Sequence, residues 1–132
     1  MFSVVIALCL GVALYLFRPM PPVVFEWLGL DHWVQSHAWF KQTSQQLPSW
    51  VLYQLPDALW AYALTVLLTK LAVGDRYSQA IYLFLGLAFV NLYEASQYFV
   101  SLGSFDWLDV AALNIGWILG VLYSLRSQVR AN

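Results

Sequence analysis

The chain has 132 residues, a net charge of −1, 61% hydrophobic residues and only 10% charged residues. A soluble domain carries about 25% charged residues, so this composition excludes an ordinary soluble domain and predicts a polytopic membrane protein. The length predicts one domain over residues 1–132, and the absence of any run of Lys and Arg excludes nucleic acid as a partner. Cys9 is the only cysteine, which excludes an internal disulfide, and we expect it to be a small buried residue.

Four apolar segments predict an all-α fold with four transmembrane helices, since a span takes about 20 helical residues. The predicted helices cover about residues 2–17, 56–73, 77–101 and 105–125. The first is expected to stay uncleaved, because no Lys or Arg precedes it and no small-x-small site follows it. In the second, Pro56 and Asp57 suit the first turn. In the last, Ser104 suits the N-cap position and Asp106 the first turn.

The segment between the first two predicted helices has a different character. Over about residues 23–40, Trp and aliphatic residues are interleaved with acids, amides and histidines, which predicts an amphipathic segment in the membrane interface. It either lies on the membrane or folds over the polar site. The polar run Lys41 to Gln46 is predicted to be a surface loop. His32 and His37 are five residues apart and do not share a helix face, so we predict an interfacial polar face and no metal site.

Positive charges near the ends of the spans predict the orientation of the bundle. One side carries Lys70, Arg76, Arg126 and Arg130, and the other carries Arg18 and Lys41. The excess on the first side favours N and C termini on the cytoplasmic side.

Alternating spans bring the start of the second helix, the end of the third and the start of the fourth to one membrane face, which this orientation makes the outer one. Acids and amides gather at these ends: Asp57, Glu94, Gln97, Asp106, Asp109 and Asn114. A carboxylate in an apolar span is costly and marks a functional site. We therefore predict that these residues form an outward-facing site that binds a ligand.

The third predicted helix carries a polar stripe. Asn91, Glu94 and Gln97 repeat at i+3, and Tyr98 follows Glu94 at i+4, so the four share one face. In an apolar helix such a stripe faces protein or water rather than lipid. One interpretation is a pocket in which Glu94 binds a ligand or exchanges a proton, with Tyr62 or Tyr98 as a neutral donor. The other is a set of interhelical hydrogen bonds made by Asn91 and Gln97.

The fourth predicted helix places Asp109, Ala112, Gly116 and Gly120 on one face. Gly116 and Gly120 have GxxxG spacing, which lets another helix approach closely, and we favour packing within the chain over a dimer face. Asp106 and Asp109 also have a second interpretation, in which they only complement the positive end of the helix dipole.

Three stretches of the sequence resemble the VanZ-like family of small bacterial membrane proteins. They are Leu55-Pro56-Asp57-Ala58-Leu59-Trp60-Ala61-Tyr62, Tyr93-Glu94-Ala95-Ser96-Gln97, and Gly103-Ser104-Phe105-Asp106-Trp107-Leu108-Asp109 with Asn114 and Gly116. The resemblance covers about residues 50–122. It adds Trp60, which stands where members commonly have His, to the expected ligand-binding residues. It implies an envelope protein of the bacterial cytoplasmic (inner) membrane, in a family named for glycopeptide (teicoplanin) antibiotic resistance.

Three functions stay open at this point. We favour a non-enzymatic cell-envelope protein whose polar site binds a membrane lipid, a lipid-linked envelope intermediate or a glycopeptide-type ligand. The second is a small accessory subunit of a larger membrane protein complex, with Gly116 and Gly120 docking a partner helix. The third is an intramembrane enzyme that acts on a lipid-linked substrate, with carboxylates as acid and base. No motif for a nucleophile, a metal or a cofactor supports the third, so we expect neither a cofactor nor catalysis.

Overall fold

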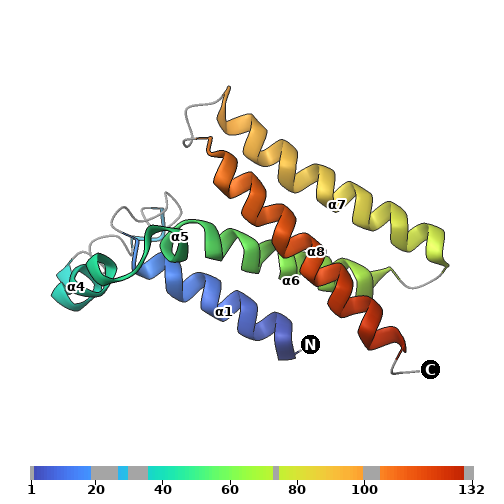
Figure 1. Ribbon diagram of the computed structural model, residues 1–132, viewed down its shortest axis with the longest axis horizontal. Coiled ribbons are helices and arrows are strands. Elements are labelled where there is room, and N and C mark those ends of the chain that lie inside the picture. The colour runs from blue at the N-terminus through green and yellow to red at the C-terminus, as the bar shows by residue number, and fades with distance from the viewer. Residues whose placement is uncertain (1, 19–26, 30–35, 73–74, 100–104, 130–132) are drawn as a thin grey trace.

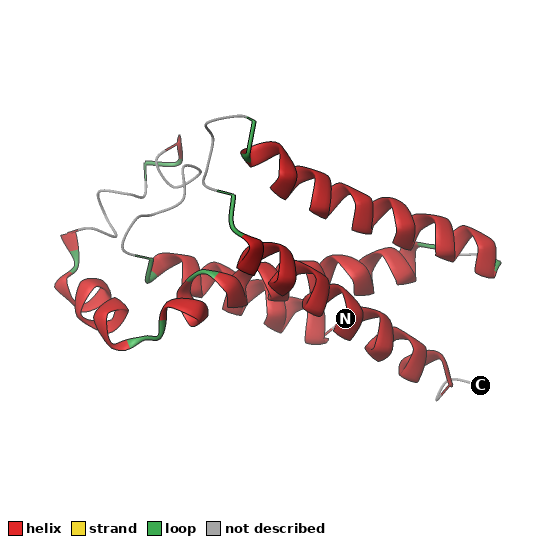
Figure 2. Cartoon of the chain, turned by 45° about the horizontal axis from the view of Figure 1, so that its top comes forward, coloured by secondary structure: helices red, strands yellow, loops and turns green. Residues whose placement is uncertain are grey.

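The computed structural model describes residues 2–18, 27–29, 36–72, 75–99 and 105–129. Within these ranges the chain is helical and contains no strand (Figure 2). The helices are α1 (Phe2–Leu16), α4 (Ala38–Gln46), α5 (Ser49–Leu52), α6 (Gln54–Leu71), α7 (Arg76–Gln97) and α8 (Trp107–Val129). The predicted all-α class is therefore confirmed.

Helix α6 is the centre of the bundle. It packs along both α8 and α1, and α7 packs against α6 and α8 (Figure 1). The short helices α4 and α5 lie near the end where α1 stops and α6 begins, the left-hand end in Figure 1. The long helices α1, α6, α7 and α8 alternate in direction, so α7 also ends, and α8 begins, towards that side.

The first helix starts at the predicted residue, and the other boundaries of the four predicted helices differ from prediction by one to four residues. The predicted start of the last helix is wrong: Asp106 Oδ1 accepts the Leu108 backbone N–H at 2.9 Å, so Asp106 caps α8 from outside its first turn. Ser104, the predicted cap, lies outside the described residues. At the other end α8 continues to Val129, because the end of an apolar run is not a helix stop unless Gly or Pro follows.

The predicted loop at Lys41 to Gln46 is wrong, because these residues belong to α4. No Gly or Pro interrupts the sequence from Ala38 to Gln46, and the helix ends just before Leu47 and Pro48. Most of the predicted amphipathic segment lies outside the described residues, His32 included, so its placement on the membrane or over the site stays a prediction. One described member, Trp39, packs edge-on against Phe17 with ring centroids 5.3 Å apart.

Two helical runs in the described chain, Ser49–Leu71 and Trp107–Val129, are long and apolar enough to cross a membrane. Four spans were predicted, so the structure supports two of them. α1 is apolar but has only 15 residues. α7 has 22 residues, but its hydropathy is lowered by Arg76 at one end and by the polar stripe near the other.

Many of the buried side chains are small, Trp117 being the large exception, and most of the large apolar side chains face outward. The buried positions of α6 include Ala61, Ala63 and Thr65, whereas Phe84 and Phe89 of α7 are 71% and 66% exposed. This distribution is typical of helices that pack in a bilayer, where lipid solvates the large apolar residues. Cys9 is also exposed, so its predicted burial is wrong. α1 instead buries Val4, Ala7 and Gly11.

The α6–α8 seam, the contact between these two helices around Gly116 and Gly120, brings two backbones together. A Cβ at Gly116 would collide with the backbone carbonyl of Ala58. One at Gly120 would lie 2.6 Å from Thr65 Cβ and 2.9 Å from the carbonyl oxygen of Tyr62. The GxxxG pair is therefore used within the chain, which confirms the favoured interpretation.

Candidate functional site at the acidic end

Hydrogen bonds tie the helix ends together at one end of the bundle. The Tyr15 hydroxyl, at the end of α1, donates to Asp57 Oδ1 at 3.0 Å. Gln54 Nε2, at the start of α6, donates to Asp109 Oδ1 in the first turn of α8 at 2.9 Å. The predicted convergence of the second and fourth helix starts is thus present. We call this region the acidic end and define it by four carboxylates, those of Asp57, Glu94, Asp106 and Asp109.

Glu94 is the most enclosed of these acids, with only 5% of its surface exposed. Its Oε2 accepts a hydrogen bond from Gln97 Nε2 at 2.8 Å, one turn along α7. Its Oε1 is buried and has no hydrogen-bond partner. The backbone N–H of Asp106 approaches the carboxylate without the geometry of a hydrogen bond to Oε1. One acceptor of a buried carboxylate is therefore left open.

The acids of this end act on one another electrostatically. Glu94 interacts unfavourably with Asp109 most strongly, and then with Asp57 and Asp106. Glu94, Asp57 and Asp109 come from three helices, and Asp106 directly precedes the third, so the alternating topology brings like charges together. Like charges that share a low-dielectric region repel strongly, and a group of opposite charge would relieve that repulsion.

Arg18 is the cation that the described residues supply near these acids, and it is already engaged. Its Nε donates to the carbonyl oxygen of Leu52 at 2.8 Å and its Nη2 to that of Tyr53 at 2.9 Å. These carbonyls lie where α5 ends and α6 begins, so Arg18 satisfies acceptors left free by a helix end. The guanidinium also lies 4.3 Å from the centroid of the Tyr15 ring. It acts on Asp57 and Asp109 electrostatically, and it anchors α1 beside the site.

Asn91 and Asn114 form a clasp between α7 and α8. Asn114 Nδ2 donates to Asn91 Oδ1 at 2.9 Å, and Asn91 Nδ2 is 3.5 Å from Asn114 Oδ1. Each amide also donates to the carbonyl four residues earlier, Leu87 and Val110 respectively. Asn114 was predicted to bind a ligand, but its hydrogen bonds hold the two helices together.

The remaining predicted site residues are spread more widely. Asp106 caps α8 through Oδ1, in line with the interpretation that it complements the helix start. Trp60 lies one turn along α6 from Asp57, and its indole faces Gly11 of α1, with Nε1 3.0 Å from where a Cβ on Gly11 would be. Trp60 is therefore placed in the α1–α6 contact rather than among the carboxylates. Tyr98 is 75% exposed and packs edge-on against Phe99 and Phe105.

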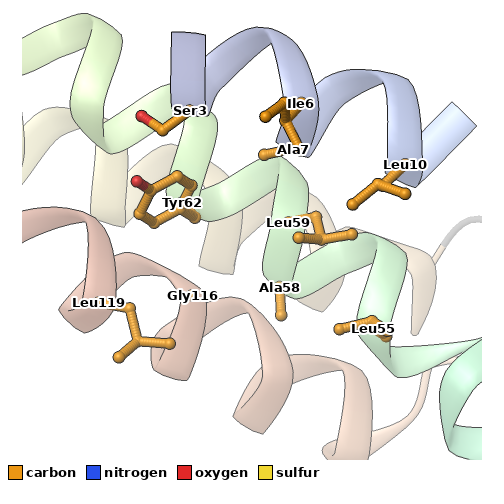
Figure 3. Close-up of a pocket in the computed structure, with 10 residues that line it drawn as sticks. All are labelled: Ser3, Ile6, Ala7, Leu10, Leu55, Ala58, Leu59, Tyr62, Gly116 and Leu119. Atoms are coloured by element: carbon orange, nitrogen blue, oxygen red, sulfur yellow. The ribbon is translucent and has the colours of Figure 1, made fainter. Parts of the chain in front are cut away.

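An apolar groove of about 510 Å³ lies between α1, α6 and α8 (Figure 3). Its lining includes Leu10, Leu59 and Leu119 and no charged residue, and its polar side chains are those of Ser3 and Tyr62. Because Tyr62 faces this groove, it is not placed as the donor to Glu94 that the sequence suggested. The groove contains no residue of α7, so it is separate from the Glu94 site.

Sequence reasoning missed Tyr15, Arg18 and Gln54 as members of this region. Arg18 was used only as an orientation signal, although a cation directly after an apolar helix also suits a helix end that faces acids. Gln54 lies two residues before Pro56, at the start of its helix. Its long side chain can therefore reach the start of a neighbouring helix. Within the described chain, no group of three or more His, Cys, Asp or Glu side chains is arranged to hold a metal ion.

No protein-family model, no curated protein and no solved structure matches this chain.

Proposed function

We propose that the protein is a VanZ-like membrane protein of the bacterial cell envelope, and that its acidic end binds a lipid, a lipid-linked envelope intermediate or a glycopeptide-type ligand. The observation that carries this proposal is the Glu94 carboxylate, buried with one oxygen unpartnered where helix ends converge. An unsatisfied buried acceptor lowers stability. A ligand that completes the hydrogen bonding explains why such a residue is tolerated.

The proposed location is the bacterial cytoplasmic membrane, with all four long helices across it. The two long apolar runs and the outward-facing Phe and Leu residues support this placement. α1 reaches about 22 Å, from 15 residues at about 1.5 Å each, against a hydrocarbon core of about 30 Å. It therefore requires a locally thin bilayer. The N and C termini are placed in the cytoplasm, which puts the acidic end at the outer face.

The accessory-subunit alternative loses its main support. It used Gly116 and Gly120 to dock a partner helix, and both glycines are covered by α6 of the same chain. A partner would need another surface. Binding at the acidic end is therefore the function that the geometry supports best.

Native mass spectrometry of protein extracted gently at its natural expression level tests this proposal. We expect a retained small molecule on the unaltered protein and at least a tenfold lower occupancy on Glu94→Gln, which keeps the shape of the side chain and removes its charge. Asp75→Asn is the matched control, because Asp75 is an exposed acid at the opposite end of α7. A molecule retained equally by Glu94→Gln, or a stoichiometric partner protein without any ligand, would contradict it.

A further inference from the structure

The chemistry of the open acceptor restricts what can bind to it. Glu94 Oε1 lies in a side chain that is 5% exposed and has no hydrogen-bond partner. An ionised carboxylate accepts hydrogen bonds and donates none. The group that completes the site must therefore be a hydrogen-bond donor.

The surrounding charge restricts the group further. Asp109, Asp57 and Asp106 all act on Glu94 with the same sign of charge. The Arg18 guanidinium beside them donates to the carbonyls of Leu52 and Tyr53. An anionic group such as a phosphate would add to the repulsion between the carboxylates. A cationic group would reduce it, and buried carboxylates pair well only when charge and hydrogen bonds are both satisfied.

Two classes of cation fit these requirements less well than an amine. A metal ion needs several ligands in a fixed arrangement, and the described residues contain no such group of three. A quaternary ammonium carries the right charge but has no N–H to donate. A protonated primary amine supplies three donors and one positive charge on a compact group.

We infer that the acidic end binds the primary ammonium group of a membrane amphiphile, with Glu94 as its main contact and Asp109 beside it. This inference rests on the proposed function and specifies its ligand class. The amphiphile enters from the bilayer, so its amine lies at the depth of the helix ends while its hydrocarbon part stays in lipid. An aminophospholipid headgroup and the amine of another membrane-anchored molecule share this chemistry.

The test uses the full chain reconstituted in vesicles of phosphatidylglycerol with equal amounts of phosphatidylethanolamine and phosphatidylcholine. The last two lipids differ at the amine, which is primary in one and quaternary in the other. After re-extraction, native mass spectrometry counts the lipids that remain bound. We expect phosphatidylethanolamine to be retained at least about tenfold over phosphatidylcholine, the ratio that one charged hydrogen bond produces. A parallel sample contains dodecylamine in place of phosphatidylethanolamine. If dodecylamine is retained over phosphatidylcholine but phosphatidylethanolamine is not, the natural ligand is a membrane-anchored amine other than an aminophospholipid.

Glu94→Gln is expected to abolish the preference for the primary amine, and Asp75→Asn to leave it unchanged. Asp109→Asn is a second variant, expected to weaken the preference less, and it keeps the test usable if Glu94→Gln fails to fold. Retention of phosphatidylcholine equal to that of both primary amines, or a preference for phosphatidylglycerol, would overturn the inference. If a lipid is retained through Glu94 without regard to its amine, the proposed function survives and only this inference fails. If no amphiphile is retained through Glu94, this inference fails, and the proposed function is decided by the protein extracted at its natural expression level.

Discussion

The α6–α8 seam and the acidic end share two helices but differ in how their buried polar groups are hydrogen-bonded. Along α6, the Thr65 and Thr69 hydroxyls donate to carbonyls four residues earlier, at 2.7 and 2.8 Å, so α6 itself satisfies these two hydroxyls. At the acidic end, side chains bond from helix to helix, and one oxygen of Glu94 stays open. On α8 the Ser124 hydroxyl is also buried without a partner, but the unpartnered atom at the acidic end belongs to a carboxylate, whose burial is more costly than that of a hydroxyl.

The two regions are expected to contribute differently, the seam to the stability of the fold and the acidic end to ligand binding. The seam gains from close backbone contact, because Gly116 and Gly120 let α8 approach the carbonyls of α6. The acidic end collects charges that repel one another. Substitutions in the seam should therefore change folding, and substitutions at Glu94 should change binding.

The largest effect is expected from Gly116→Leu. The new side chain would collide with the backbone carbonyl of Ala58. A backbone held in a helix cannot move aside as a flexible side chain can. We expect a loss of about 3 kcal/mol or more in the free energy of unfolding, measured by denaturant titration in detergent micelles. Ala111→Leu on the exposed face of α8 is the control and should change little. If Gly116→Leu unfolds like the control, the seam does not depend on close backbone contact.

A smaller effect is expected where the two regions meet, at the Asn91–Asn114 clasp. Replacing either residue by Leu leaves the other amide without its interhelical partner. A double-mutant cycle of Asn91→Leu and Asn114→Leu should give a coupling free energy of about 1 kcal/mol, within the range for hydrogen bonds between membrane helices. A coupling near zero would show that the amides act only within their own helices.

The smallest effect is expected at Asp75, far from both regions. Its side chain accepts the backbone N–H of Ser78 at 2.7 Å and caps α7. That hydrogen bond holds the pKa of the Asp75 carboxyl below its ordinary value. A lowered folded-state pKa means that the stabilisation is present at neutral pH and is lost as pH falls through that pKa. Asp75→Ala should lower the unfolding midpoint slightly at pH 7, with the difference disappearing at acid pH. A difference that persists in acid would exclude the charged cap as its cause.

Much of the fold follows from the sequence because the apolar runs and their breaks are explicit. The alternation of helices and the polar stripe on α7 were both predictable, and the stripe correctly placed Glu94 beside Gln97. Helix ends were less predictable, because a helix continues beyond its apolar run, as α8 does to Val129. Polar sequence likewise does not exclude a helix, which is why α4 was missed.

The composition of the site was only partly predictable, for a geometric reason. Asp57 and Asp109 were found because acids stand out in apolar segments. Tyr15 lies 42 residues before Asp57 of α6, and Arg18 lies 34 residues before Leu52 of α5. Only the packing of α1 against α6 brings them to the site. Trp60 was included by resemblance, yet its position on α6 turns it toward Gly11. Periodicity predicts which face of its own helix a residue lies on, but it does not predict which neighbouring helix that face contacts.

Thermal unfolding of the unaltered protein and of Glu94→Gln, each delipidated and then resupplied with lipid extracted from the source membrane, would separate a ligand group from a structural one. Without lipid we expect Glu94→Gln to be the more stable by about 1 kcal/mol, because it removes a buried charge with an unsatisfied oxygen. With lipid we expect the unaltered protein to gain stability and the variant to gain much less. A variant that is less stable in both conditions, and that gains as much from lipid as the unaltered protein, would show that Glu94 supports the fold and binds nothing.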